Sequence, residues 1–265
     1  MTKPLNKIVV LLCFLFAIAP AMAQKKQKTI LVIVAHPDDE NMGGEILAKY
    51  ARLNYKIQVI IATDGKDGVR VTKIPAGDSL GRLRQLESKC ACEKLGIDPP
   101  LFLSLDRMDT KIGVRAYLNA HKKFLGELKK HIERIQPDMM ITFGPDGEYG
   151  HSEHIVVGAA VTELLLREGW VEKYPLYFMV STKEQVEDDA DLSYVDKKYL
   201  EYAISFSDED EKKSIEAAKC YVTQFTVEEL REEEERKTKD LQNIVYYRRF
   251  KVVEKQKAKN DFLLK

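Results

Sequence analysis

Short apolar segments and amphipathic segments alternate along the chain, and this pattern predicts an α/β fold. The apolar segments contain many β-branched residues, which is typical of strands buried on both faces of a parallel sheet. Five of them predict strands, at residues 29–35, 56–63, 101–105, 138–143 and 175–180. The first segment, TILVIVA, shows the pattern most clearly because it contains no polar residue after Thr29.

The amphipathic segments between these strands carry apolar residues at spacings of three and four, which predicts helices. One helix is expected after Gly43 and Gly44, and the others at residues 80–95, 120–135 and 152–168. Residues 64–78 are rich in Gly, Lys and Asp and predict a long loop. Strands that alternate with helices favour right-handed crossovers, so we expect a Rossmann-like, mostly parallel sheet with helices on both faces.

The last third of the chain departs from this alternation. Its expected elements are an acidic loop, two helices, a late strand and a tail, at residues 184–191, 207–224, 226–243, 244–253 and 255–265. Thr226 and Glu229 fit a capping box at the start of the second helix. We therefore expect a Rossmann-like core at residues 24–180 and a helical C-terminal extension at residues 181–265 that packs on the same domain.

The N-terminal segment predicts a secretory signal peptide at residues 1–23. Lys3 and Lys7 precede an uncharged apolar run at residues 8–19, and Ala21-Met22-Ala23 has the small-x-small form of a cleavage site. The run is shorter than the about 20 residues that a spanning helix needs. We therefore expect a mature chain that begins at Gln24, has no stable membrane span and is periplasmic or secreted.

The composition excludes some classes of protein. The 265 residues include 42 Lys and Arg, 42 Asp and Glu, and 45% apolar residues, which excludes a disordered chain. Without a basic excess, binding to nucleic acid through bulk charge is not expected. Loss of the signal peptide would leave Cys90, Cys92 and Cys220, for which three small semi-buried thiols are the simplest expectation. A bridge from Cys90 or Cys92 to Cys220 is the alternative, and no feature of the sequence indicates an oligomeric state.

Two segments carry the chemistry, and each follows a predicted strand. His36-Pro37-Asp38-Asp39-Glu40 follows the first strand, and Tyr149-Gly150-His151-Ser152-Glu153-His154 follows the fourth. Ligands of open α/β sheets bind at the carboxyl ends of the strands. Because three of the five histidines of the chain lie in these segments, we expect them to converge with the two aspartates.

This set of side chains suits a catalytic metal. His36, Asp39 and His154 supply two imidazoles and a carboxylate, and three protein ligands with a fourth position open are typical of catalytic zinc. Iron and cobalt also accept such ligands. Zinc activates bound water and polarises a carbonyl. Asp38 then remains as the general base, and His151 as the group that stabilises charge or donates a proton.

The segment Ala35-His36-Pro37-Asp38-Asp39-Glu40 resembles the A-H-P-D-D-E signature of the LmbE-like, PIG-L-type zinc deacetylases. That family removes acetyl groups from N-acetylglucosamine-containing substrates and related N-acyl compounds. The resemblance covers most of residues 29–158. The family's usual G-H-P-D-H is Gly150-His151-Ser152-Glu153-His154 here, so both histidines are kept.

The resemblance implies a role for each matching residue. It makes His36, Asp39 and His154 the zinc ligands and Asp38 the base. It places His151 and Tyr149 beside the developing oxyanion, and it makes Arg84 and Asp106 substrate-binding residues. The structural alternatives are an ion pair of Arg84 with Glu87 and a turn at Asp106. A late glutamine of the family matches Gln224 only loosely.

We therefore expect a zinc-dependent hydrolase that removes an N-acetyl group from a small-molecule or glycan substrate. Two alternatives are an amidase for a non-sugar N-acyl or thiol-conjugate substrate and a non-catalytic glycan-binding module. Retention of Asp38 argues against the binding module. A dinucleotide-binding protein is disfavoured because G-x-G-x-x-G is absent after the first strand.

Overall fold

The computed structural model describes residues 26–186, 191–240 and 242–252. The expected signal peptide, its cleavage site before Gln24 and the expected tail at residues 255–265 lie outside the described residues, as does part of the acidic loop predicted at 184–191.

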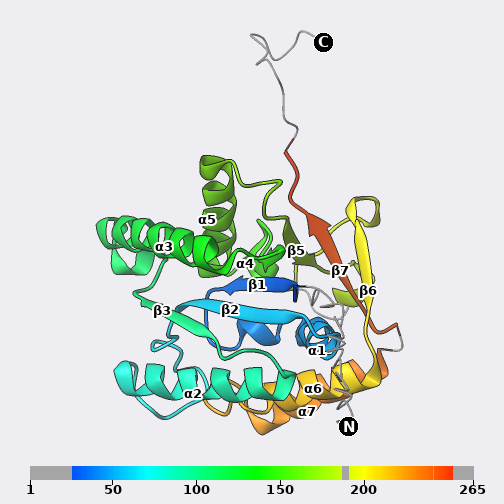
Figure 1. The fold of residues 1–265 in the computed structure, drawn as a ribbon. Helices are drawn as coiled ribbons and strands as arrows, with labels where there is room; N and C mark the ends of the chain where they lie inside the picture. The colour runs from blue at the N-terminus through cyan, green and yellow to red at the C-terminus, as the bar shows by residue number, and fades with distance from the viewer. Residues whose placement is uncertain (1–25, 187–190, 241, 253–265) are drawn as a thin grey trace, which may run out of the picture.

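A seven-stranded sheet forms the centre of the molecule (Figure 1). Its strand order is β3-β2-β1-β4-β5-β7-β6, and the first five strands are parallel. The strands are β1 (Thr29–Val34), β2 (Lys56–Thr63), β3 (Leu101–Leu105), β4 (Met139–Thr142), β5 (Leu176–Val180), β6 (Tyr202–Ser205) and β7 (Ile244–Arg249). Every residue of β1 is buried, as its uninterrupted apolar sequence predicts.

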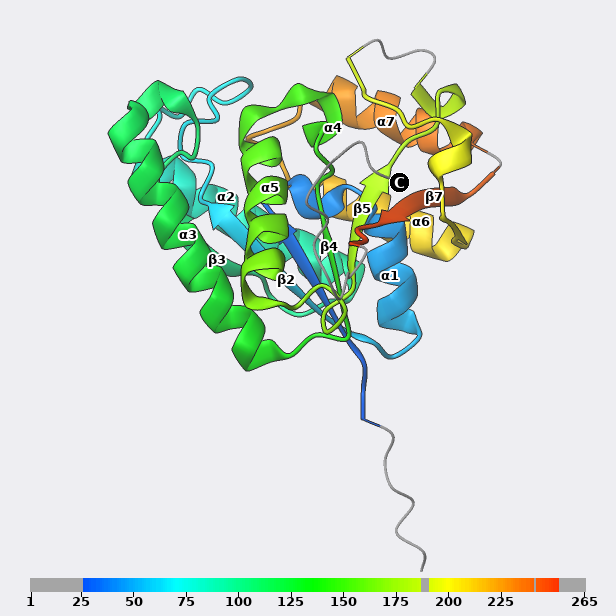
Figure 2. The same cartoon turned by 90° about the horizontal axis from the view of Figure 1, so that it is seen from above.

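Helices cover both faces of the sheet (Figures 1 and 2). On one face lie α3 (Val114–Ile135) and α5 (Ser152–Glu168), preceded by the short α4 (Gly147–Gly150). On the other lie α1 (Gly44–Arg52), α2 (Asp78–Leu95), α6 (Asp208–Ala218) and α7 (Val227–Lys239). The predicted α/β class, the parallel core and the helices on both faces are confirmed.

The strand order determines where a ligand can bind. β1 connects through α1 to β2 on one side, whereas its other neighbour β4 connects through α5 to β5 on the opposite side. Connections that leave in opposite directions open a crevice at the carboxyl ends of the two strands. A Cβ at Gly158 of α5 would lie 2.4 Å from the Phe143 carbonyl oxygen, so this glycine lets α5 pack directly on the end of β4.

The C-terminal extension differs from the expected helical segment. β7 pairs antiparallel with both β5 and β6, so the extension also completes the sheet, and β6 was not predicted. The helix predicted at residues 207–224 ends at Ala218, after which the chain turns. The predicted late strand and the capping box of Thr226 and Glu229 are confirmed.

A disulfide joins Cys90 of α2 to Cys220, just after α6, with a Cα–Cα distance of 5.9 Å. The expectation of three free thiols was therefore wrong for these two residues, and the alternative bridge is the one that forms. Cys92 is buried and free. The sequence did not favour the bridge because its two ends are 130 residues apart, and only the packing of α6 on α2 brings them together.

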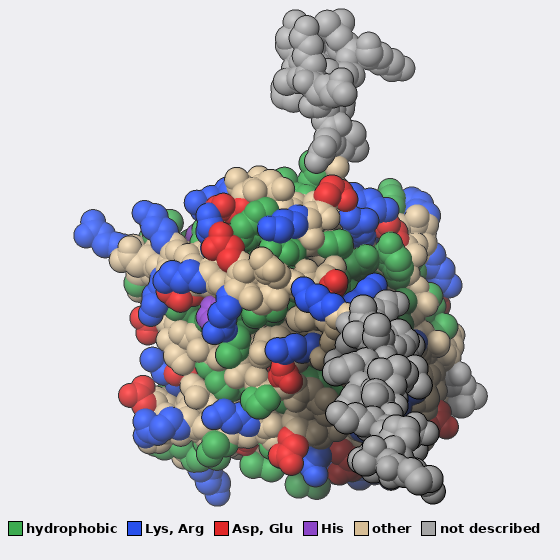
Figure 3. All heavy atoms as spheres, in the orientation of Figure 1, with side chains coloured by type: hydrophobic (Ala, Val, Ile, Leu, Met, Phe, Trp, Pro, Cys, Tyr) green, Lys and Arg blue, Asp and Glu red, His purple; other side chains and the backbone are tan. Residues whose placement is uncertain are grey.

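Positive and negative side chains are interspersed over the face of the molecule that Figure 3 shows. This mixture agrees with the equal numbers of acidic and basic residues in the chain. In the part of the chain that the structure describes, the helices are too short or too polar to cross a bilayer.

The ion pair between Arg52 and Asp210, which joins α1 to α6, gives a testable pH dependence. Arg52 donates from Nε and Nη2 to the two carboxylate oxygens, at 3.0 and 2.8 Å. Burial alone would raise the pKa of Asp210, but the bonds from Arg52 and Ser207 lower it from 3.8 to about 2. A carboxyl whose pKa is depressed by folding stabilises the fold above its unfolded pKa and loses that effect as the pH falls through the folded pKa.

Arg52→Met is therefore expected to lower the free energy of unfolding at neutral pH, because Asp210 loses the partner that favours its ionised form. The difference from the parent should shrink as the pH falls from about 4 to about 2. Urea unfolding at several pH values measures both. Arg82→Met, at an exposed arginine of α2, is the control. A cost that is constant across this pH range would mean that the ion pair does not depress the pKa of Asp210.

Candidate active site

The turn after β1 carries His36, Asp38 and Asp39 into the crevice. The carboxylate of Asp39 fixes this turn, because its Oδ2 accepts the backbone N–H groups of Ala35 and His36 at 3.0 and 2.7 Å. The same oxygen lies 3.4 Å from His36 Nδ1. The sequence therefore folds back on itself so that one carboxylate and one imidazole face the same space.

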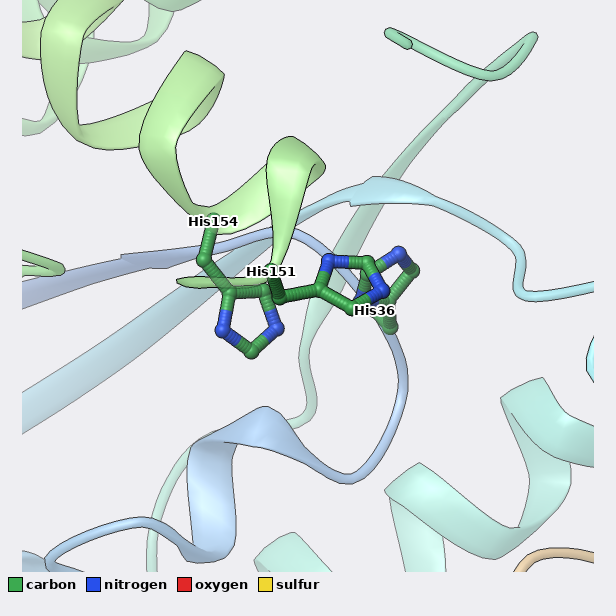
Figure 4. Close-up of side chains that lie close together, drawn as sticks. All are labelled: His36, His151 and His154. Atoms are coloured by element: carbon green, nitrogen blue, oxygen red, sulfur yellow. The ribbon is translucent and has the colours of Figure 1, made fainter. Parts of the chain in front are cut away.

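His151 and His154 reach this space from the start of α5 (Figure 4). The centres of their rings lie 4.5 Å apart, and the ring of His36 lies 4.9 Å from that of His151. One nitrogen from each of the three rings falls within 4.8 Å of the others. The predicted convergence of three histidines from two distant segments is confirmed, and the three could hold a metal ion.

The contacts of Asp39 and His154 also fit a cation. Asp39 Oδ1 lies 3.2 Å from His154 Nε2, yet neither ring nitrogen of this buried histidine makes a hydrogen bond of acceptable geometry with any described residue. Two donors bound at 2.0–2.1 Å to a tetrahedral zinc lie ~3.3 Å apart. Asp39 Oδ2 lies at about this distance from His36 Nδ1, and the other carboxylate oxygen, Oδ1, at about this distance from His154 Nε2. The assignment of His36, Asp39 and His154 as the three ligands stays a prediction, with His151 beside them.

The electrostatic environment favours positive charge on His36 and disfavours it on His151. Burial alone would lower the pKa of His36, but the carboxylates of Asp39 and Glu153 raise it to about 10. Burial and the charges of His36 and His154 lower the pKa of His151 to about 4. Burial would raise the pKa of Asp39, but His154 and His36 hold it well below its usual value. An anionic Asp39 and a neutral His151 are forms that bind metal cations.

Glu153 is a site residue that the sequence analysis did not single out. Its carboxylate lies 2.9 Å from His36 Nε2 and accepts the backbone N–H of Met108 at 2.7 Å. Only 3% of the residue is exposed. A carboxylate on the outer nitrogen of a metal-binding histidine orients the ring and raises its basicity. The sequence feature that could have indicated Glu153 is its position between the two candidate histidines, in the first turn of the predicted helix.

Glu153→Gln is expected to weaken metal binding by about 10–100-fold. An amide has a single acceptor oxygen, so it cannot serve both His36 and the Met108 N–H. Competition with a chromophoric chelator measures the affinity. Glu163→Gln changes an exposed glutamate of the same helix and should leave the affinity unchanged. Equal affinities for the two variants would remove Glu153 from the metal site.

Asp38 faces Arg84. Arg84 Nη2 lies 3.1 Å from Asp38 Oδ2 and donates to the Pro37 carbonyl at 2.7 Å, while Nη1 donates to the Gly65 carbonyl at 2.9 Å. Burial raises the pKa of Asp38 to about 7, against the opposing charge of Arg84. The alternative pairing of Arg84 with Glu87 was wrong, because Glu87 accepts hydrogen bonds from Thr223 instead.

A cavity of about 160 Å³ opens over these side chains. Its walls come from the turn after β1, the long loop 64–68, the start of α5, and Gln224 of the extension. Tyr149 lies on the rim and is 48% exposed, and Arg84 forms part of the wall. Asp106 is not among the described residues that line the cavity. Its exposed carboxylate lies 3.7 Å from Lys66 Nζ, so its role in substrate binding stays a prediction.

A family described as GlcNAc-PI de-N-acetylase, PIG-L, matches residues 31–165. This match covers about half of the chain, including both segments that form the site. The chain therefore belongs to the PIG-L family, as its A-H-P-D-D-E segment indicated.

A relative of this chain is the 1D-myo-inositol 2-acetamido-2-deoxy-alpha-D-glucopyranoside deacetylase of Actinosynnema mirum. It is 29% identical over 180 residues, which cover 61% of this chain and 62% of that protein. The chain thus spans less than two thirds of the length of this relative.

Solved structures share the fold at low sequence identity. N,N'-diacetylchitobiose deacetylase from Pyrococcus horikoshii superposes with a TM-score of 0.62 at 18% identity, over 85% of each chain. The 4-carboxy-2-hydroxymuconate hydratase of Pseudomonas putida has a TM-score of 0.60 at 18% identity, over 88% of this chain and all of that chain. These likenesses describe the fold alone, since one of the two proteins is a hydratase.

Proposed function

We propose that this protein is a zinc-dependent deacetylase that removes the acetyl group from an N-acetylglucosamine-containing small molecule or glycan. The observation that carries the proposal is the placement of Asp38, with its raised pKa, in one cavity with three converging histidines. Membership of the PIG-L family and the named activity of its relative support the reaction type.

Each of these residues has its own role in the proposed reaction. A zinc ion held by His36, Asp39 and His154 would supply a Lewis acid and lower the pKa of bound water. Asp38, held by Arg84, takes a proton from the attacking water as the water oxygen bonds to the amide carbon. His151 and Tyr149 face the carbonyl oxygen and stabilise its developing charge. The C–N bond breaks, Asp38 returns the proton that it took from water to the nitrogen, directly or through His151, and acetate and a free amine leave.

The runner-up is an amidase that uses the same residues on a non-sugar N-acyl or thiol-conjugate substrate. A non-catalytic glycan-binding module is a weaker candidate, because such a module needs no buried carboxylate with a pKa near neutrality. The walls made by the loop 64–68 and Gln224 would distinguish sugar from non-sugar substrates.

A screen for product amines tests the function directly. The purified, zinc-loaded protein is incubated with N-acetylglucosamine oligomers, peptidoglycan fragments and N-acyl amino acids, and both free amine and acetate are measured. Equal amounts of the two products from an N-acetylglucosamine substrate are expected, with none from His154→Ala. Turnover of N-acyl amino acids alone would favour the runner-up, and absence of both products throughout would overturn the proposal.

We further propose that the protein is periplasmic or secreted. The signal-peptide pattern at residues 1–23 supports this, and so does the Cys90–Cys220 disulfide, because such bonds persist mainly in oxidising compartments. N-terminal sequencing of the protein recovered from its producing cells is expected to begin at Gln24. An intact Met1 on protein from the membrane fraction would contradict the cleavage.

A further inference from the structure

A buried hydrogen-bond network lies behind Asp38, and the reaction described above does not use it. Its centre is the carboxylate of Glu40, which has no exposed surface. Glu40 Oε2 accepts the backbone N–H of Asp38 at 3.0 Å. Glu40 Oε1 accepts hydrogen bonds from the hydroxyl groups of Ser88 and Tyr221. Glu40 thus connects the backbone of Asp38 to α2 and to the C-terminal extension.

The backbone of Asp38 needs such support. Its φ is 115° and its ψ is −31°, a conformation that residues other than glycine rarely adopt. Strained residues of this kind persist where the surrounding structure holds them in place. The bond from the Asp38 N–H to Glu40 is one such restraint, and it acts on the residue whose carboxylate faces the cavity.

Tyr221 reaches Glu40 from 181 residues away in the sequence and is fully buried. Two adjoining links hold it there. The preceding residue, Cys220, is bonded to Cys90, and Thr223 donates from N and Oγ1 to Glu87 at 2.9 and 2.6 Å. The extension is therefore fastened to the side of α2 that carries Arg84, Glu87 and Ser88, which lie three and four residues apart.

We propose that Tyr221 is a positioning residue for Asp38, acting through the Glu40 carboxylate, and that the Cys90–Cys220 disulfide keeps its hydroxyl in place. The hydroxyl groups of Tyr221 and Ser88 together fix the rotamer of Glu40. Glu40 Oε2 then holds the Asp38 N–H, and the Asp38 carboxylate stays directed at the substrate. This proposal rests on the proposed function in one respect, the role of Asp38 as base.

The decisive variant is Tyr221→Phe, which removes one hydroxyl group and little volume. The Asp38 amide is expected to exchange with deuterium faster, by up to about tenfold, because Glu40 loses one of the two hydroxyl donors that hold its rotamer. Fragmentation of a peptide that covers residues 36–42 by electron transfer in the mass spectrometer separates the exchange of the Asp38 amide from that of its neighbours. We also expect kcat to fall about tenfold with KM and metal content unchanged. A merely structural role would lower thermal stability without this split.

Two further variants make the test specific. Ser88→Ala removes the other donor to the same Glu40 oxygen and should reproduce the faster exchange and the lower kcat. Tyr174→Phe is the matched control, because Tyr174 is a buried tyrosine whose hydroxyl has no hydrogen-bond partner among the described residues. It should match the parent protein in all measurements.

Unchanged Asp38 exchange in folded, metal-loaded Tyr221→Phe would overturn the proposal. So would equal changes in Tyr221→Phe and Tyr174→Phe. The exchange measurement needs no substrate, so it decides the positioning role even if the parent protein releases no amine. A parent protein that releases no amine would overturn the proposed function and leave the positioning role of Tyr221 intact.

Discussion

The Asp38→Asn variant is expected to keep its metal and to lose turnover by about 10²–10⁴-fold. The amide has nearly the shape of the carboxylate but cannot accept a proton from water. Asp38 contacts Arg84 and its backbone bonds to Glu40, and no hydrogen bond joins its side chain to the three histidines. Amine release under saturating substrate measures the turnover of the variant, and elemental analysis of the purified variant measures its metal content.

Asp39→Asn provides the contrast, because Asp39 contacts both His36 and His154. This variant should lose metal together with activity. Asp98→Asn, at a partly exposed carboxylate that does not line the cavity, should keep both. If Asp38→Asn is metal-free while Asp39→Asn retains metal, the roles of the two aspartates must be exchanged. If Asp38→Asn is as fast as the parent, the base lies elsewhere, with His151 as the next candidate.

Removal of the disulfide is expected to lower the free energy of unfolding by about 4 kcal/mol. The bond closes a segment of 130 residues, and cross-links over long segments restrict the unfolded chain most. The double variant Cys90→Ala/Cys220→Ala removes the bond without leaving a reactive thiol. Urea unfolding of the double variant and of the parent, each with and without a phosphine reductant, measures the difference.

The reductant supplies an internal control for this experiment. It should destabilise the parent to about the level of the double variant and leave the double variant unchanged. Thiol titration of the unreduced, unfolded parent after removal of residues 1–23 should detect Cys92 alone. Detection of three thiols would show that the bond does not form, and the expected loss of stability would then be wrong as well.

Local patterns in the sequence were sufficient for the central part of the fold. The apolar run of β1 and the spacing of apolar residues in α3 and α5 each specify an element and its buried face. The position of His36 after β1 and of His151 and His154 after β4 then followed from the geometry of parallel sheets. This is why the convergence of the three histidines could be predicted before any contact was known.

Features that depend on partners distant in the sequence could not be predicted in this way. Tyr202–Ser205 is short and mostly exposed, and it becomes a strand only by pairing with β7. Glu153 has the same sequence context as many helix-surface glutamates, and only folding places it against His36. The disulfide likewise required the packing of α6 against α2.

The strand order at the edge of the sheet has a consequence for how the chain folds. β6 precedes β7 in the sequence but lies outside it, so β6 joins the sheet only together with β7 or after it. The edge of the sheet is therefore incomplete until residues 244–249 are in place. Until then, β5 presents an open edge that can pair with other chains.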